Sequence, residues 1–93
     1  MKTVTVIIGN SDDKLSQVRW IEFVEQCAGR IGDLARLVHF EVRSGASALW
    51  QTSAWTFEIK DGQIVQLKND LATIRHCFEQ DSIVWLEGET QLI

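Results

Sequence analysis

The sequence of 93 residues contains no proline and no tyrosine, and it has only two cysteines, Cys27 and Cys77. These cysteines stand far apart, form no C-x-x-C pair and belong to no cluster of cysteine and histidine with zinc-ligand spacing. We therefore expect two reduced, partly buried thiols, no metal and no other cofactor.

Long hydrophobic runs are also missing. The longest purely apolar run near the N-terminus covers residues 6–8, which is too short for a secretory signal or a membrane span. The composition, 45% hydrophobic and 24% charged, is that of a soluble globular protein, and the length is enough for one hydrophobic core. We expect a single domain over residues 1–93 that stays in the cytoplasm and does not bind membranes.

The chain has no excess of positive charge, because 9 lysines and arginines accompany 13 aspartates and glutamates. The net charge of -4 arises entirely in residues 76–93, which hold Glu79, Asp81, Glu87 and Glu89 but no lysine or arginine. Binding to a phosphate backbone requires clustered cations, so we expect no direct contact with nucleic acids. The acidic cluster is compatible with a basic protein partner, although a solvated acidic edge is its commoner cause.

Alternating hydrophobic and polar residues predict strands at residues 3–8, 37–43 and 54–59, and the apolar, β-favouring run at residues 82–86 predicts a fourth. In the second of these, the alternation places Val38, Phe40 and Val42 inward. It places His39, Glu41 and Arg43 outward. A turn at residues 87–88 would allow residues 90–93 to return as a short fifth strand.

Two helices are predicted between the strands, at residues 13–31 and 64–78. Apolar residues recur at helical spacing in both. The order β-α-β-β-α-β predicts a ferredoxin-like α/β sandwich, with both helices on one face of an antiparallel sheet and the other face free for solvent or a partner. The two predicted stripes are Trp20, Val24, Cys27 and Ile31, and Ile64, Leu67, Leu71, Ile74 and Phe78.

The stretch GNSDDKLSQ, residues 9–17, is the densest polar segment between predicted elements. It offers Asn10, Ser11, Asp12 and Asp13 as caps for the first helix, where one would be enough. The surplus polar groups could instead hold a ligand where a strand meets a helix. Because two aspartates would repel a bare phosphate, that ligand would be cationic, metal-bridged or a protein.

His39 is the one histidine predicted on a strand, and its phase directs it to the open face of the sheet. Glu41 would lie on the same face and Glu58 across the ladder, so a His–Glu pair for acid–base chemistry is conceivable. A histidine that simply faces solvent or a partner is the simpler alternative.

Four tryptophans are unusual in so small a domain. Trp20 and Trp55 have core spacing, whereas Trp50 lies in a predicted loop and Trp85 in a uniformly apolar strand. Exposed tryptophans are typical anchors of interfaces, although a loop tryptophan often folds back over the core. Ile7 and one phase of the last strand would leave apolar area on the open face, which favours a homodimer or the capture of a partner there.

The segments IGNSDDKLSQ, VHFEVRS, WQTSAW and QDSIVWLEGETQLI together resemble a family of small uncharacterised proteins of bacteriophages and other mobile elements. The residues after His39 depart from the small residue and the aromatic expected in that family. The resemblance implies no established activity, but it directs attention to certain positions as candidates for binding a ligand or partner. They are Asn10, Asp12, Asp13, Lys14, Gln17, His39, Trp50, Gln51, Asp81 and Ser82.

Three functions follow as expectations. The first is a non-enzymatic phage-type accessory protein, for instance a counter-defence inhibitor that binds a host immune protein or sequesters a nucleotide signal; this rests on analogy and on the lack of a catalytic motif. The second is a small nucleotide-processing enzyme that uses His39 with a nearby carboxylate. A structural component of a phage particle is a third reading.

Overall fold

The fold consists of four strands and two long helices. The structure is a computed structural model, and it describes residues 1–45 and 48–93. The order of the strands and helices confirms the predicted β-α-β-β-α-β arrangement. Two short 3-10 turns, η1 (Ser11–Asp13) and η2 (Asp61–Gln63), follow β1 and precede α2 respectively. The main elements are β1 (Lys2–Gly9), α1 (Gln17–Leu34), β2 (Leu37–Arg43), β3 (Thr52–Ile59), α2 (Ile64–Cys77) and β4 (Val84–Glu89).

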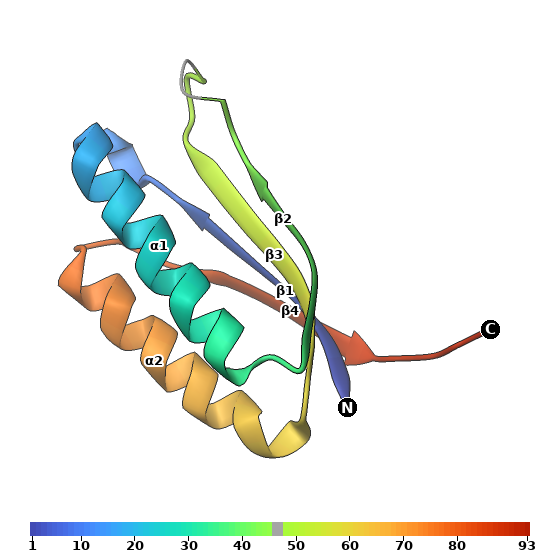
Figure 1. The fold of residues 1–93 in the computed structure, drawn as a ribbon. Helices are drawn as coiled ribbons and strands as arrows, with labels where there is room; N and C mark the ends of the chain where they lie inside the picture. Colours follow the sequence, from blue (N-terminus) through green and yellow to red (C-terminus); the bar gives the residue numbers. More distant parts are fainter. Residues whose placement is uncertain (46–47) are drawn as a thin grey trace.

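The sheet is antiparallel with the strand order β2-β3-β1-β4, and α1 and α2 lie side by side on one of its faces (Figure 1). This is the ferredoxin-like sandwich that the sequence predicts. The central strands, β1 and β3, pair along their full length from Lys2 opposite Ile59 to Gly9 opposite Thr52. β2 and β4 form the two edges.

The hydrophobic core lies between the helices and the sheet. Both predicted helical stripes contribute to it, and Phe23 of α1 approaches Phe78 with 5.2 Å between the ring centroids. Every second residue of β1 and β3 points into this core, as the alternation predicts. Burying a side chain of this size stabilises the fold by roughly 1.5–3 kcal/mol. The core residues of the two central strands are Val4, Val6, Ile8, Trp55, Phe57 and Ile59.

The first helix begins at Gln17 instead of near residue 13, and the predicted caps are wrong. Its N-cap is Ser16, whose hydroxyl accepts a hydrogen bond from the Arg19 backbone amide at 3.3 Å. The reason is the Asn10 side chain, which donates to the Leu15 carbonyl and accepts from the Leu15 amide, both at 2.9 Å. This double link closes residues 10–15 into a separate turn ahead of the helix.

The predicted facing of β2 is wrong beyond Val38. The register with β3 shifts between Val38 and Phe40, so that His39 is an extra residue in a β-bulge. After the bulge, Phe40 and Val42 pair with Thr56 and Ala54 on the open face. A bulge inverts the phase of every later residue, and strict alternation in the sequence does not reveal it. Glu41 and Arg43 consequently point to the helix side.

The C-terminal segment also differs from expectation. β4 continues through the predicted turn at residues 87–88 and ends with Glu89 opposite Lys2. Residues 90–93 form no strand, and this tail extends away from the body (Figure 1). Pairing of β4 with residues 2–7 of β1 therefore replaces the expected hairpin.

The two cysteines have different environments. Cys27 is buried in the core, and this burial raises the pKa of its thiol to about 12. Cys77 is exposed, not partly buried as expected. Both thiols are free.

Candidate functional site

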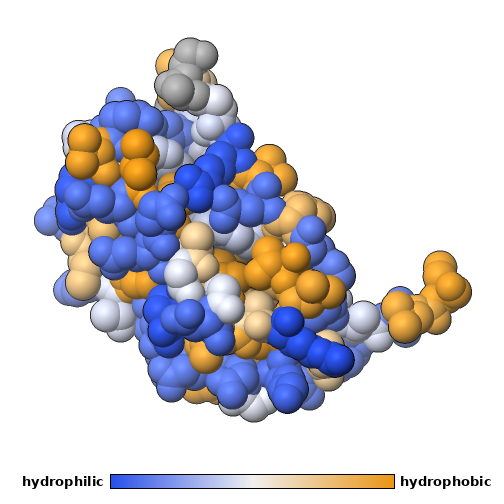
Figure 2. All heavy atoms as spheres, in the orientation of Figure 1, coloured by the Kyte–Doolittle hydropathy of each residue, from blue (hydrophilic) through white to orange (hydrophobic). Residues whose placement is uncertain are grey.

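The face of the sheet opposite the helices is a candidate site, and we call it the open face. It carries exposed apolar side chains on both edge strands, including Phe40 at 54% exposure and Leu86 at 56%. The register assigns to it Thr3, Thr5, Ile7, Leu37, Phe40, Val42, Ala54, Thr56, Glu58, Val84 and Leu86. The prediction that Ile7 and one phase of the last strand leave apolar area here is confirmed. In Figure 2 hydrophobic residues are also visible along the side of the molecule where β2 runs and at the tip of the tail.

Charged residues of the strands avoid the open face. Glu58 is the one charged residue that the register places there. The others share the helix side, where Arg43 bonds Glu25 of α1 at 3.0 Å and Glu41 accepts from the Trp55 indole. These helix-side charges are Lys2, Glu41, Arg43, Glu87 and Glu89. The open face is therefore almost free of charge, which is typical of interface cores.

The polar groups of the open face already have partners within the chain. Thr5 and Thr56 join their hydroxyls at 2.8 Å across β1 and β3. The Glu58 carboxylate accepts from Thr90 at 2.5 Å, from Thr3 at 2.8 Å and from His39 Nε2 at 2.9 Å. Because these groups are satisfied internally, covering the face would leave few of them without a hydrogen bond.

Glu58 is 8% exposed, although it lies on the open face. Its hydrogen bonds from Thr90, His39 and Thr3, in that order of importance, lower the pKa of its carboxyl group. The carboxylate form is therefore favoured, and it orients the His39 ring through Nε2. The expected His–Glu pair thus forms with Glu58.

Glu41 is excluded from this pair because the bulge turns it to the opposite face. A groove of about 380 Å³ surrounds the pair, and no serine or cysteine lines it. The groove can therefore offer acid–base chemistry but no nucleophile of those types from the described residues. Its lining consists of Met1, Arg36, Leu37, His39, Glu58, Thr90 and Leu92.

The other nine candidate positions lie around the far end of the sheet, where β1 meets η1 and the loop before β3; we call this region the polar end. His39 does not lie at the polar end. Its partner Glu58 is opposite Thr3, near the start of β1, whereas the polar end begins where Gly9, the last residue of β1, lies opposite Thr52. Six residue steps along β1 separate these pairs, about 20 Å at ~3.3 Å per residue. The candidate positions thus divide between two regions.

Asn10 is the centre of the polar end and is buried, with 8% exposure. Besides its bonds to Leu15, its amide donates to Gln51 Oε1 at 2.7 Å, and Gln51 Nε2 in turn donates to Gln17 Oε1 at 2.6 Å. These contacts connect the end of β1 to the loop before β3 and to α1. Asn10, Gln17 and Gln51 therefore act first as structural residues.

Asp12 and Asp13 have left-handed backbone conformations, with φ of 51° and 54°. Aspartate and asparagine tolerate this region better than most residues, and it costs about 1 kcal/mol or more per residue. Nearby, Lys14 bonds Asp81 at 3.3 Å. These polar residues thus have a local structural explanation, which is the simpler of the two readings of GNSDDKLSQ.

A cleft of about 330 Å³ nevertheless opens at the polar end. Trp50 borders it with 71% of its surface exposed, so the reading in which this tryptophan folds over the core is wrong. Asp12 and Ser82 reach the same cleft. Asp81 does not line this cleft but a different one, beside α2.

Several residues of these sites carry no sequence signal. Thr3 and Thr90 are ordinary strand and tail residues in the sequence, and only the pairing of β1 with β3 and β4 brings them to Glu58. A carboxylate flanked by threonines could have been found only if the register were known.

The comparisons with known proteins support the fold. No family model matches the chain, and no curated protein matches it. A protein of the DUF3240 family from Shewanella baltica has a similar structure, with a TM-score of 0.54 and 8% identity over 99% of this chain and 92% of that one. A hypothetical protein from Arabidopsis thaliana has a TM-score of 0.54 and 11% identity over 98% of this chain and 89% of that one. At such identities the likeness concerns the fold alone.

The described residues offer neither a metal site nor a membrane-spanning helix. Within residues 1–45 and 48–93, no three histidine, cysteine or acidic side chains are grouped so that they could hold a metal ion. No helix in the same ranges has the length and hydrophobicity to cross a membrane.

Proposed function

We propose that this chain is a small non-enzymatic accessory binding protein that acts as a homodimer through its open face. The observation that carries the proposal is the nearly uncharged open face, on which Leu37, Phe40, Val42, Val84 and Leu86 are exposed. A strongly charged partner would find little to pair with there. A second copy presents the same neutral surface and matches it by symmetry.

The size of the open face agrees with this occupant. Its longest strands have eight residues. Eight residues at ~3.3 Å each and four strands at ~4.8 Å spacing give an upper projected area of roughly 500 Å² per copy. Two such faces would together bury up to about the 1,000 Å² that a specific interface requires. The satisfied hydroxyls of Thr5 and Thr56 and the bonded Glu58 keep the cost of desolvation low.

The biological role that we propose for the dimer is that of a phage-type accessory factor, such as a counter-defence protein. The resemblance of the IGNSDDKLSQ and QDSIVWLEGETQLI segments to mobile-element proteins supports this role, with a host protein or a nucleotide-like signal as the target. The dimer itself can be tested without knowledge of the target.

The test is the mass in solution measured by sedimentation equilibrium. We expect the mass to approach twice the chain mass of 10.6 kDa at millimolar concentration and to fall toward that of one chain on dilution to low micromolar concentration. Leu86→Asp should give a folded monomer, because it introduces a charge into the neutral face. Val65→Asp is the matched control, since Val65 of α2 is 69% exposed outside that face, and it should remain dimeric. A wild-type mass of one chain at every concentration would refute the proposal.

The contact between His39 and Glu58 favours a second candidate, an enzyme that processes nucleotides. Incubation with a panel that includes cyclic dinucleotides would reveal turnover, which His39→Ala should abolish while the fold persists. Glu41→Gln is the control, because Glu41 lies on the opposite face and should retain the activity. Absence of turnover across the panel would eliminate this candidate.

A further inference from the structure

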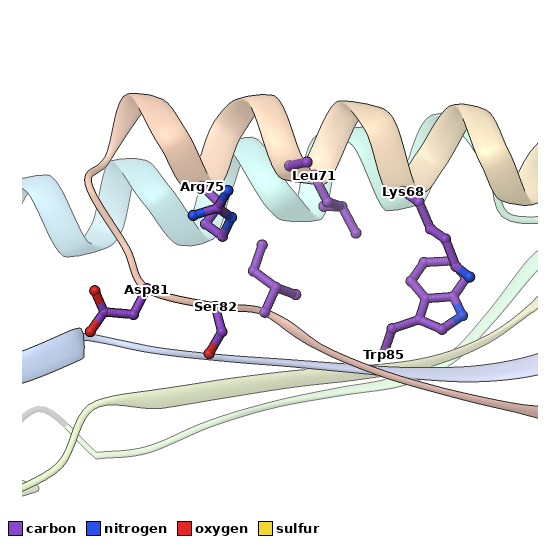
Figure 3. Close-up of a pocket in the computed structure, with 8 residues that line it drawn as sticks. Lys68, Leu71, Arg75, Asp81, Ser82 and Trp85 are labelled. Carbon is purple, nitrogen blue, oxygen red and sulfur yellow. The ribbon is translucent and has the colours of Figure 1, made fainter.

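A groove runs between α2 and the edge strand β4, on the helix side of the sheet (Figure 3). Its volume is about 390 Å³, within the range of binding clefts. Side chains from α2 approach it from above, and the segment leading into β4 forms its other wall. Its lining consists of Lys68, Leu71, Ala72, Arg75, Asp81, Ser82, Ile83 and Trp85.

The groove combines an apolar floor with positive charge. Leu71, Ile83 and the half-buried Trp85 ring supply the apolar surface. Arg75 donates to the Gln80 carbonyl at 2.9 Å and has no carboxylate partner within the described ranges. Its guanidinium therefore keeps donors available for an acidic group.

The remaining charges at the groove are already paired. Lys68 lies 3.5 Å from Glu87 and 5.1 Å from the centroid of the Trp85 ring. Asp81 accepts from Lys14 at 3.3 Å. Arg75 is consequently the group that would select the charge of an occupant.

The two edges of the sheet differ in how they are protected. Edge strands tend to be protected against pairing by bulges and charges. β2 has both, because His39 forms a bulge and Glu41 and Arg43 follow it. β4 pairs with β1 without a register shift, and its two charged residues, Glu87 and Glu89, are confined to its second half. The outer edge of β4 is therefore suited to accept another strand.

We propose that the outer edge of β4 and the adjoining groove bind an extended peptide with an acidic side chain. The peptide would add to the sheet next to β4 through main-chain hydrogen bonds. Alternate side chains of an added strand point to the same face about 6.8 Å apart. One acidic side chain would then bind Arg75, and an apolar one two residues away would pack on Ile83 and Trp85.

This site is separate from the proposed dimer face. Trp85 and Glu87 point to the helix side, whereas Val84 and Leu86 point to the open face. A dimer held through the open face leaves both of its grooves accessible. The failure of one proposal would therefore not decide the other.

The test uses the whole protein and a synthetic heptapeptide of alternating threonine and valine, acetylated and amidated at its ends, with glutamate in place of the central valine. We expect saturable binding by isothermal titration calorimetry. Replacing the glutamate by lysine, or Arg75 by glutamine, should weaken binding by about tenfold or more, because a charge-assisted hydrogen bond is lost. Arg36→Gln, at the other end of the molecule, is the matched control and should leave binding unchanged.

A second measurement does not depend on the folding of any variant. The same glutamate peptide with alternate backbone amides methylated keeps its side chains but cannot form a ladder, so it should not bind. Equal binding of the glutamate and lysine peptides, equal binding of the methylated peptide, or no binding at millimolar concentration would each overturn the proposal.

Discussion

The two faces of the sheet are made from the same four strands but from opposite residues of each strand. On the helix side, β1 and β3 present a mostly apolar core, interrupted by the buried Ser53 and ended by Lys2. The charges on this side pair with one another or with the helices, as Arg43 does with Glu25 of α1. On the open face, apolar side chains of β2 and β4 are exposed and the central strands contribute threonines. One face is therefore covered within the chain, and the other is suited to be covered from outside.

The bulge at His39 is what distinguishes the two faces on β2. Without the shift in register, the sequence alternation would direct Phe40 and Val42 toward the helices and Glu41 and Arg43 toward the open face. With it, the apolar pair lies on the open face and the charged pair reaches α1 and Trp55. A single extra residue thus makes the open face apolar along β2.

Leu71→Asp should have the largest effect. Leu71 is 2% exposed between α2 and the sheet, so an aspartate there would be a buried charge without a partner. We expect the domain to unfold, with a penalty of several kcal/mol. Circular dichroism would measure the loss of structure. Leu86→Asp makes the same change on the open face and should remain folded; equal unfolding of both variants would contradict the difference between the faces.

Trp55→Ala should destabilise the protein by roughly 3–5 kcal/mol, because a large core side chain is removed. Trp55 is 1% exposed and belongs to the helix side of β3. Chemical denaturation would give the change in the free energy of unfolding. A change below about 1 kcal/mol would mean that this side of the sheet is not the core.

Glu58→Gln should alter the pH dependence of stability. The pKa of the Glu58 carboxyl is lowered in the folded state, so this group stabilises the fold above its unfolded pKa and the stabilisation disappears as the pH falls through the folded value. The wild type should therefore lose stability more steeply than Glu58→Gln below about pH 4.3, the ordinary glutamate value. Thermal melts across this range would test it, and identical slopes would be inconsistent with the Thr90, His39 and Thr3 contacts.

Trp50→Ala should have the smallest effect on folding. With 71% of its surface exposed at the polar end, this side chain contributes little to the core. We expect a change within about 0.5 kcal/mol, which a denaturation curve can resolve from the Trp55→Ala value. A cost comparable to that of Trp55→Ala would show that the loop folds over the core after all.

The sequence predicts the fold well because each helix and both central strands carry regular hydrophobic patterns, as in the Ile64 to Phe78 stripe. It fails at three places: the cap at Ser16, the bulge at His39 and the continuation of β4 to Glu89. The first depends on side-chain bonds that close residues 10–15 into a separate turn, and the other two depend on strand pairing.

The candidate site is only partly accessible from sequence for the same reason. Asn10, Gln17 and Gln51 do meet, but as a structural network, whereas the partners of Glu58 depend on a register that no local pattern encodes.

Methyl NMR during dilution tests most directly whether the open face is held by a second copy. Val42 and Val84 belong to the open face, and Val65 is an equally simple exposed valine on α2. We predict that the methyl signals of Val42 and Val84 shift together as the protein is diluted from millimolar to low micromolar concentration, while those of Val65 stay in place. The account would be contradicted if the signals of all three valines stayed unchanged on dilution and the mass remained that of one chain.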